Sequence, residues 1–253
     1  SYQGNNNITR QITVGFPPNL VIVKSRSGGE AVWHSTPMGS KSFSFSSNGA
    51  SFSNAITGFK ATDFIIGNDP KVNSIGIMYD WQAFKVIPGF SGNPIDFAIG
   101  QYDGNNVAGR PITGLGFEPD MVFVKGDFSG GASAWRTRED DDGLSMRISD
   151  SADSQNEIVR FTKDGFQLGN SENTNFCVSA FNCHHYFWFA FTNITDLAFS
   201  GAYNGNGLDN RKIRTLFQPD LVWIKGDKAG QEAVFRSSTL KGDLTHSFGG
   251  SGD

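Results

Sequence analysis

The chain has 253 residues and a formal net charge of −4, with 21 Lys and Arg against 25 Asp and Glu. Only 18% of the residues are charged, and no basic stripe is available to neutralise phosphates, so we expect no nucleic-acid partner. No apolar run approaches the roughly 18–20 residues that a membrane-spanning helix needs, so we expect no membrane partner either.

The composition predicts an all-β protein. The chain contains 23 Phe and 31 Gly but only four Met. Aromatic and β-branched residues suit a pleated sheet, whereas Gly, Asn, Asp and Pro supply turns. The long stretches of Leu, Ala, Glu and Lys that helices favour are missing.

One sequence pattern occurs three times. Each copy begins with Phe, has Pro at its third position, continues with an apolar run and ends with Lys, over residues 16–24, 117–125 and 217–225. A Tyr-x-Gly-Asn segment precedes each copy, and its tyrosines are Tyr2, Tyr102 and Tyr203. A period of about 100 residues predicts tandem small domains rather than a solenoid of short turns.

We therefore divide the chain into two full repeats, 1–100 and 101–201, and a partial third repeat, 202–253. Each full repeat is predicted to be a β-sandwich of the jelly-roll or concanavalin-like kind. The third repeat has no counterpart of the later strands, and half a sandwich would expose apolar strands and an open edge. We expect it to be completed by sequence beyond Asp253, or by a neighbouring segment or subunit.

The first part of each repeat is predicted to be a turn followed by a buried strand. Proline fixes φ in the turn, and the Asn or Asp after it is suited to cap the turn. The short, unbroken apolar run that follows indicates a strand covered on both faces. The lysine that ends each run, Lys24, Lys125 or Lys225, is expected to extend to water.

A hairpin is predicted next, because a glycine-containing turn leads to a second strand. Further along, residues 59–68 and 161–170 both end in Gly-Asn, and their alternating apolar residues indicate a strand with one buried face. Each full repeat then closes on an aromatic strand, 79–84 or 186–191. The second repeat is five residues longer just before this strand.

The aromatic position of the hairpin strand is the main candidate for ligand binding. Trp33 and Trp135 could stack on sugar rings, but they recur in register with the fold pattern, so we favour a place in the core. Arg136 and Arg236 follow the aromatic residue in the second and third repeats. We expect both to face solvent or a neighbouring subunit.

Two segments are weak candidates for metal binding. The acidic run Glu139, Asp140, Asp141 and Asp142 could hold Ca²⁺, but it lacks the alternating spacing of an EF-hand loop, and a solvated hairpin tip is favoured. Cys183 and the adjacent His184–His185 pair could suggest zinc, although neighbouring residues of a strand point to opposite faces. We therefore expect no required cofactor.

The only two cysteines are Cys177 and Cys183. An extended chain holds residues six apart near 20 Å, too far for a disulfide. We therefore favour two buried thiols on one strand, and a turn between them would reverse this interpretation.

The sequence offers little support for catalysis. No Gly-x-Ser-x-Gly elbow, phosphate-binding glycine loop or His-Glu-x-x-His motif is present, so we expect no enzyme and assign no catalytic residue. Carboxylate pairs for glycoside cleavage stay open, because such pairs meet in space and not in sequence.

Taken together, the ordered motifs resemble the repeated β-domains of bacteriophage virion structural proteins of the tail-fibre or appendage type. The resemblance covers nearly the full chain and is clearest over residues 202–236. This chain departs from the pattern at Asn19, at Leu216 and in the insertion at 183–185.

The resemblance implies a virion or extracellular location, other virion proteins and further copies of the chain as partners, and adhesion to a host-surface glycan or protein. It carries over no catalytic residues. The alternative is an extracellular carbohydrate-binding or adhesive protein, or a capsule-degrading enzyme, built on the same sandwich.

Overall fold

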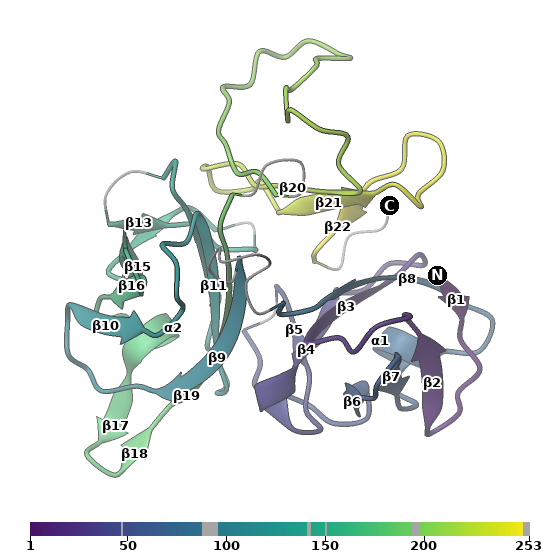
Figure 1. The fold of residues 1–253 in the computed structure, drawn as a ribbon, viewed down its shortest axis with the longest axis horizontal. Helices are drawn as coiled ribbons and strands as arrows, with labels where there is room; N and C mark the ends of the chain where they lie inside the picture. Colours follow the sequence, from purple (N-terminus) through teal and green to yellow (C-terminus); the bar gives the residue numbers. More distant parts are fainter. Residues whose placement is uncertain (47, 88–95, 141–142, 150, 194–197, 250–253) are drawn as a thin grey trace.

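The computed structural model describes residues 1–253 except 47, 88–95, 141–142, 150, 194–197 and 250–253. Its sheets are antiparallel throughout the described residues, and the few helices are single turns, so the predicted all-β class is confirmed. None of the helices in this part of the chain is long and apolar enough to cross a membrane. In Figure 1 the three repeats form three lobes around a common centre.

Repeat 1 is a sandwich of two sheets. The larger sheet has five strands, in the order β1 (Tyr2–Gln3), β8 (Met78–Phe84), β3 (Leu20–Ser25), β4 (Val32–Ser35) and β5 (Phe43–Ser44). The smaller sheet has three strands, in the order β2 (Arg10–Thr13), β7 (Asp63–Ile66) and β6 (Ile56–Phe59). Two single turns of helix join these strands, η1 (Thr36–Met38) and α1 (Pro70–Asn73).

Repeat 2 has the same plan with one addition. Its larger sheet has the order β12 (Ser133–Thr137), β11 (Met121–Gly126), β19 (His185–Phe191) and β9 (Phe97–Asp103). Strand β9 begins before the predicted boundary at residue 101, and because it pairs with β19 along its whole length we assign all of it to repeat 2. Its smaller sheet has the order β10 (Arg110–Thr113), β16 (Gly165–Leu168) and β15 (Ile158–Thr162). The remaining elements are β13 (Leu144–Ser145), β14 (Ser154–Gln155), α2 (Glu172–Asn175) and the added hairpin of β17 (Cys177–Ser179) and β18 (Asn182–Cys183).

Repeat 3 contributes a single sheet to the described structure. Its strands are β20 (Leu221–Ile224), β21 (Val234–Ser237) and β22 (His246–Ser247). Residues 202–216, which align with the opening of the other repeats, contain no strand and run along the outside of the molecule (Figure 1).

The central strand of each full repeat is buried on both faces, as its unbroken apolar run predicts. Val21 and Val23 point into the sandwich of repeat 1, together with Ile12 and Phe64 of the smaller sheet. Ile22, between them, points to the other face and enters a second cluster. This alternation follows from the two-residue period of a strand.

The second cluster is shared by all three repeats, and we call it the shared core. Its aromatic members are Trp33, Phe43 and Phe45 from repeat 1, Phe97, Phe123, Trp135, Phe187 and Phe189 from repeat 2, and Phe235 and Phe248 from repeat 3. The ring of Trp33 lies 5.3 Å from that of Phe123 and 5.5 Å from that of Phe189, edge-on in both cases. Aromatic pairs favour this geometry and bury a large apolar area.

Hydrogen bonds at matching positions close the three repeats into a ring. The amide of Ala31 donates to the carbonyl oxygen of Phe248 at 3.0 Å, and that of Ala233 donates to Ile148 at 3.1 Å. The third link runs from the hydroxyl of Ser133, which occupies the same position, to the carbonyl oxygen of Phe45 at 3.0 Å. Repeat 1 thus contacts repeat 3, repeat 3 contacts repeat 2 and repeat 2 contacts repeat 1, as in a closed head-to-tail trimer.

The Tyr-x-Gly-Asn segment binds the later part of its own repeat. The ring of Tyr2 stacks on that of Tyr79 at 5.3 Å, and its hydroxyl donates to the carbonyl oxygen of Val72 at 2.7 Å. At Gly4, a Cβ atom would lie 2.0 Å from the carbonyl oxygen of Ser74, so only glycine fits.

Repeat 2 uses the same contacts at matching positions. Tyr102 stacks on Tyr186 at 5.3 Å and donates to Thr174 at 2.7 Å, and a Cβ atom at Gly104 would meet Phe176 at 2.2 Å. These matching contacts explain why the segment occurs at the start of both full repeats.

We predict that Phe123→Ala destabilises the whole ring. Phe123 is 1% exposed and packs on Trp33 and Phe45 of repeat 1 and on Phe189 of repeat 2, so its truncation leaves a cavity where the repeats meet. We expect a loss of about 3–5 kcal/mol in the free energy of unfolding, measured in urea by tryptophan fluorescence and circular dichroism. The exposed substitution Ile75→Ala is the control, and an equal effect of both would contradict the shared core.

Candidate functional site

The two tryptophans that were candidates for sugar stacking lie inside the protein. Trp33 is 0% exposed and Trp135 is 6% exposed, and both belong to the shared core. Their rings therefore occupy the core position that the repeat pattern favours and are not on the surface.

Arg136 is also inside, and the prediction that it faces solvent is wrong. Its guanidinium group donates to the carbonyl oxygens of Leu144 at 2.9 Å and Ile158 at 3.1 Å. It thereby links the hairpin strand β12 to the strands that follow it, and this compensates for burying the charge. Arg236 is half-buried and donates in the same way to Leu244 and Gly242.

The prediction that the strand-ending lysines reach water is wrong for two of the three. Lys24 and Lys125 are 0% exposed. The ammonium group of each donates to a glycine carbonyl oxygen of the following turn, Gly29 or Gly131. Lys24 also donates to Gly249 of repeat 3 at 3.2 Å. Turn carbonyls thus replace the water that the sequence led us to expect.

Burial lowers the pKa of Lys125 to about 8, although the nearby charges of Glu30 and Asp127 favour the charged form. Protonation of this lysine is therefore less favourable than protonation of a lysine in water.

The buried carboxylate of Asp80, in contrast, has charged partners. Asp80 accepts bonds from Arg26 at 2.7 Å and from His246 of repeat 3 at 3.2 Å. Burial would raise the pKa of Asp80, but these bonds outweigh it and lower the pKa.

We predict that Lys125 makes stability rise with pH between 7.5 and 9.5. An unfolded lysine has a pKa near 10.4, so in this window the unfolded chain binds more protons than the folded chain, and raising the pH favours folding. Relative to Lys125→Met, the wild type should gain about 1–2 kcal/mol across the window, measured by urea unfolding at several pH values. A difference that does not change with pH would contradict the lowered pKa.

The first two residues of the acidic run, Glu139 and Asp140, lie in a turn at the end of β12. The carboxylate of Asp140 accepts a bond from the amide of Thr137 at 2.6 Å, which caps the turn. Glu139 is exposed, and Asp141 and Asp142 lie outside the described residues. Within the described residues, no three His, Cys, Asp or Glu side chains come together as a metal site would require.

The adjacent histidines of repeat 2 have separate partners. His184 stacks on the ring of Phe128, with 3.9 Å between the ring centres. The Nδ1 atom of His185 instead lies 2.6 Å from a carboxylate oxygen of Asp103. The two rings therefore do not converge on a common point, which agrees with the prediction for neighbouring strand residues.

The two cysteines form a disulfide, and the prediction of two free thiols is wrong. A tight turn separates them, so Cys177 and Cys183 face each other across the β17–β18 hairpin with their Cα atoms 3.8 Å apart. The 20 Å estimate assumes one extended strand, and it fails once the chain reverses direction. The five extra residues of repeat 2 are used for this hairpin.

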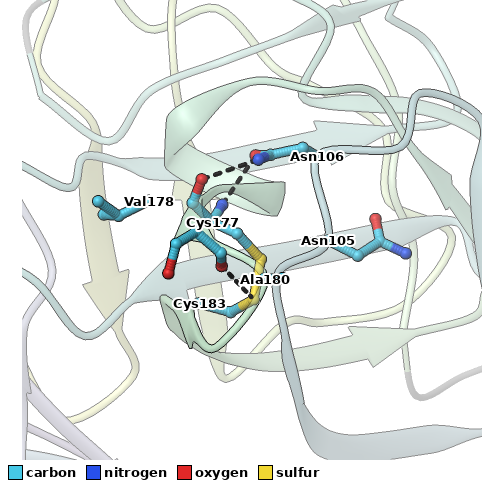
Figure 2. A pocket seen from close by; sticks show the side chains of 7 residues that line it. Asn105, Asn106, Cys177, Val178, Ala180 and Cys183 are labelled. Atoms are coloured by element: carbon cyan, nitrogen blue, oxygen red, sulfur yellow. Dashed lines mark hydrogen bonds between the residues drawn. A yellow bond between two sulfur atoms is a disulfide. The ribbon is translucent and has the colours of Figure 1, made fainter.

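The hairpin projects from repeat 2 (Figure 1). It presents apolar side chains to solvent. Phe181, at its turn, is 100% exposed, and Val178 is 63% exposed. Two hydrogen bonds hold its base: the amide group of Asn106 donates to the carbonyl oxygen of Cys177 at 2.8 Å, and the amide of Cys177 donates back at 2.7 Å (Figure 2).

A hollow of about 270 Å³ lies between this hairpin and the loop that begins repeat 2. It is lined by Asn105 and Asn106 on one side and by Cys177–Ala180 and Cys183 on the other (Figure 2). The disulfide and the two asparagine bonds fix its walls. We take the hairpin and this hollow, together called the repeat 2 hairpin site, as the candidate functional site.

Sequence reasoning missed the exposed Phe181. The signal was present, because the insertion is found in only one repeat and extra residues at one position of a repeated fold form a loop. An aromatic residue in such a loop has no place in the core. Comparison with protein-family models, with curated proteins and with solved structures finds no match to this chain.

We predict that reduction of the disulfide loosens the hairpin without unfolding the repeats. For a loop of this length, the cross-link should contribute about 2 kcal/mol to hairpin stability, which corresponds to roughly 30-fold in amide exchange rate. Hydrogen exchange of residues 177–183 with and without reductant measures it. Strand β3 is the internal control, and equal acceleration there, or no acceleration in the hairpin, would contradict the prediction.

Proposed function

We propose that the chain is a non-enzymatic structural component of a bacteriophage particle that adheres to the host surface through the repeat 2 hairpin site. The observation that carries this proposal is the fully exposed Phe181, held by a disulfide on a ring of three tightly packed repeats. An exposed aromatic residue on a rigid support is typical of a binding surface, because little conformational freedom is lost when it is covered.

The use of the other candidate residues supports a structural role. Trp33 and Trp135 pack in the shared core, and Arg136 donates hydrogen bonds to backbone carbonyl groups inside the fold. The repeated sequence pattern, which resembles that of phage virion β-domains, supports the placement on a particle. The same site would serve the alternative, an extracellular carbohydrate-binding protein, because an aromatic ring beside the asparagine-lined hollow suits a sugar.

Immunogold electron microscopy tests the placement on the particle. We expect an antibody against this chain to label the exterior of phage particles whose genome encodes it. Particles that carry no label would overturn the virion assignment. Binding of the isolated chain to a glycan array would then favour the alternative, and turnover of a capsular polysaccharide would overturn the non-enzymatic assignment.

We predict that Phe181→Ser weakens adsorption to host cells by about ten-fold or more, as expected for loss of one buried aromatic anchor. Protein stability should hardly change, because this side chain is fully exposed. The matched control is Ile75→Ser: Ile75 is 74% exposed in the short loop of repeat 1 that replaces the hairpin. Equal adsorption by both variants would rule out the hairpin as the adhesive site.

A further inference from the structure

The central strand of repeat 3 has one unpaired edge in the described structure. In repeat 1, β3 pairs with β4 on one side and β8 on the other, and in repeat 2, β11 pairs with β12 and β19. Within the described residues, β20 pairs only with β21. No strand of the described residues therefore lies beside β20 in the position that β8 and β19 take in the other repeats.

The strands that fill this position in repeats 1 and 2 share one sequence, Tyr-x-Trp-x-Ala-Phe, at 79–84 and 186–191. Its tyrosine stacks on the tyrosine that opens the repeat. Its tryptophan packs edge-on against a phenylalanine of the smaller sheet, Phe64 or Phe166, at 5.6 Å in both repeats. The pattern therefore encodes both the pairing and the packing of this strand.

A second contact fixes the end of the same strand. In repeat 1, the side chain of Asn19 accepts a bond from the amide of Val86 at 2.9 Å, just beyond β8. In repeat 2, Asp120 accepts the amide of Asn193 at 2.7 Å, just beyond β19. The matching residue of repeat 3 is Asp220, whose side chain is exposed.

Repeat 3 retains the residues that would receive such a strand, and they are uncovered. Tyr203, which matches Tyr2, is 44% exposed, and Ile224 is 38% exposed where Val23 and Val124 are 0%. A Cβ atom at Gly205 would meet nothing within 4 Å, although the matching Gly4 and Gly104 are tightly covered. Repeat 3 therefore keeps the residues that contact β8 and β19 in the other repeats, but in the described structure no strand covers them.

We infer that the free edge of β20 binds a β-strand with the sequence Tyr-x-Trp-x-Ala-Phe, supplied by a polypeptide segment outside these 253 residues. The chain has five tyrosines, and only Tyr79 and Tyr186 are followed by Trp two positions later. Both already lie in β8 and β19, so a second folded copy has no such strand to give.

The bound strand runs antiparallel to β20, as β8 and β19 run to their partners. Its tyrosine stacks on Tyr203, its phenylalanine lies opposite Leu221, and the amide beyond it donates to Asp220. Addition of a strand to an open edge supplies backbone hydrogen bonds, while alternate side chains give selectivity. This inference does not depend on the proposed adhesive function, because it concerns another repeat.

A synthetic peptide of residues 54–86, which carries β6, β7, α1 and β8, tests the inference on the intact chain. We expect saturable binding of one peptide per chain in calorimetry. Amide exchange over residues 221–226 should slow by about ten-fold or more, and trypsin cleavage at the exposed Arg211, Lys212 and Arg214 should slow as well. The peptide with Tyr79→Ser and Trp81→Ser, and the chain with Tyr203→Ala, should each lose most of this effect.

A fusion of residues 54–86 behind Asp253 through a glycine–serine linker gives the same readouts without requiring a soluble peptide. No added protection of 221–226 in the fusion would overturn the inference. Protection of this edge in the chain alone that disappears on dilution would also overturn it, because a second copy would then cover β20. Neither experiment measures adsorption to host cells, so the strand-binding inference can be tested independently of the proposed adhesion through the repeat 2 hairpin site.

Discussion

The structure depends on the burial of one strand from two sides. In β3 and β11, one set of alternate side chains closes the sandwich of its own repeat, and the other set enters the shared core. Burial of apolar area contributes about 25 cal/mol per Å², so the same strand stabilises a repeat and the ring at once. Separation of the repeats would expose Trp33, Phe123 and Phe235 to water, which couples the stability of each repeat to that of its neighbours.

This constraint accounts for the unusual composition. The many aromatic residues are needed because three sheets must fill one common interior, where large flat side chains interlock. It also accounts for the buried cations. Lys24, Lys125 and Arg136 are buried, and each donates hydrogen bonds to backbone carbonyl oxygens, which compensates for burying its charge.

The sequence predicts the fold class and the burial of the central strand, because both are recorded in a local pattern. It does not predict what covers the outer face of that strand, since an unbroken apolar run indicates burial on both faces but not the identity of the neighbour. The sequence predicts that Lys125 reaches water, because nothing in it shows that the carbonyl oxygen of Gly131 lies within reach of the ammonium group. The sequence does not predict the disulfide, because residues 179–182 contain neither the glycine nor the proline that would indicate a turn between the two cysteines.

The closed ring of hydrogen bonds has a consequence for how the molecule assembles. Equivalent contacts of this kind usually join three separate chains, and such trimers fall apart when diluted. Here one polypeptide carries all three participants, which keeps them at an effective concentration in the millimolar range whatever the amount of protein in solution. The ring therefore forms as part of folding, and a single molecule already possesses the threefold geometry that other assemblies must gather from three.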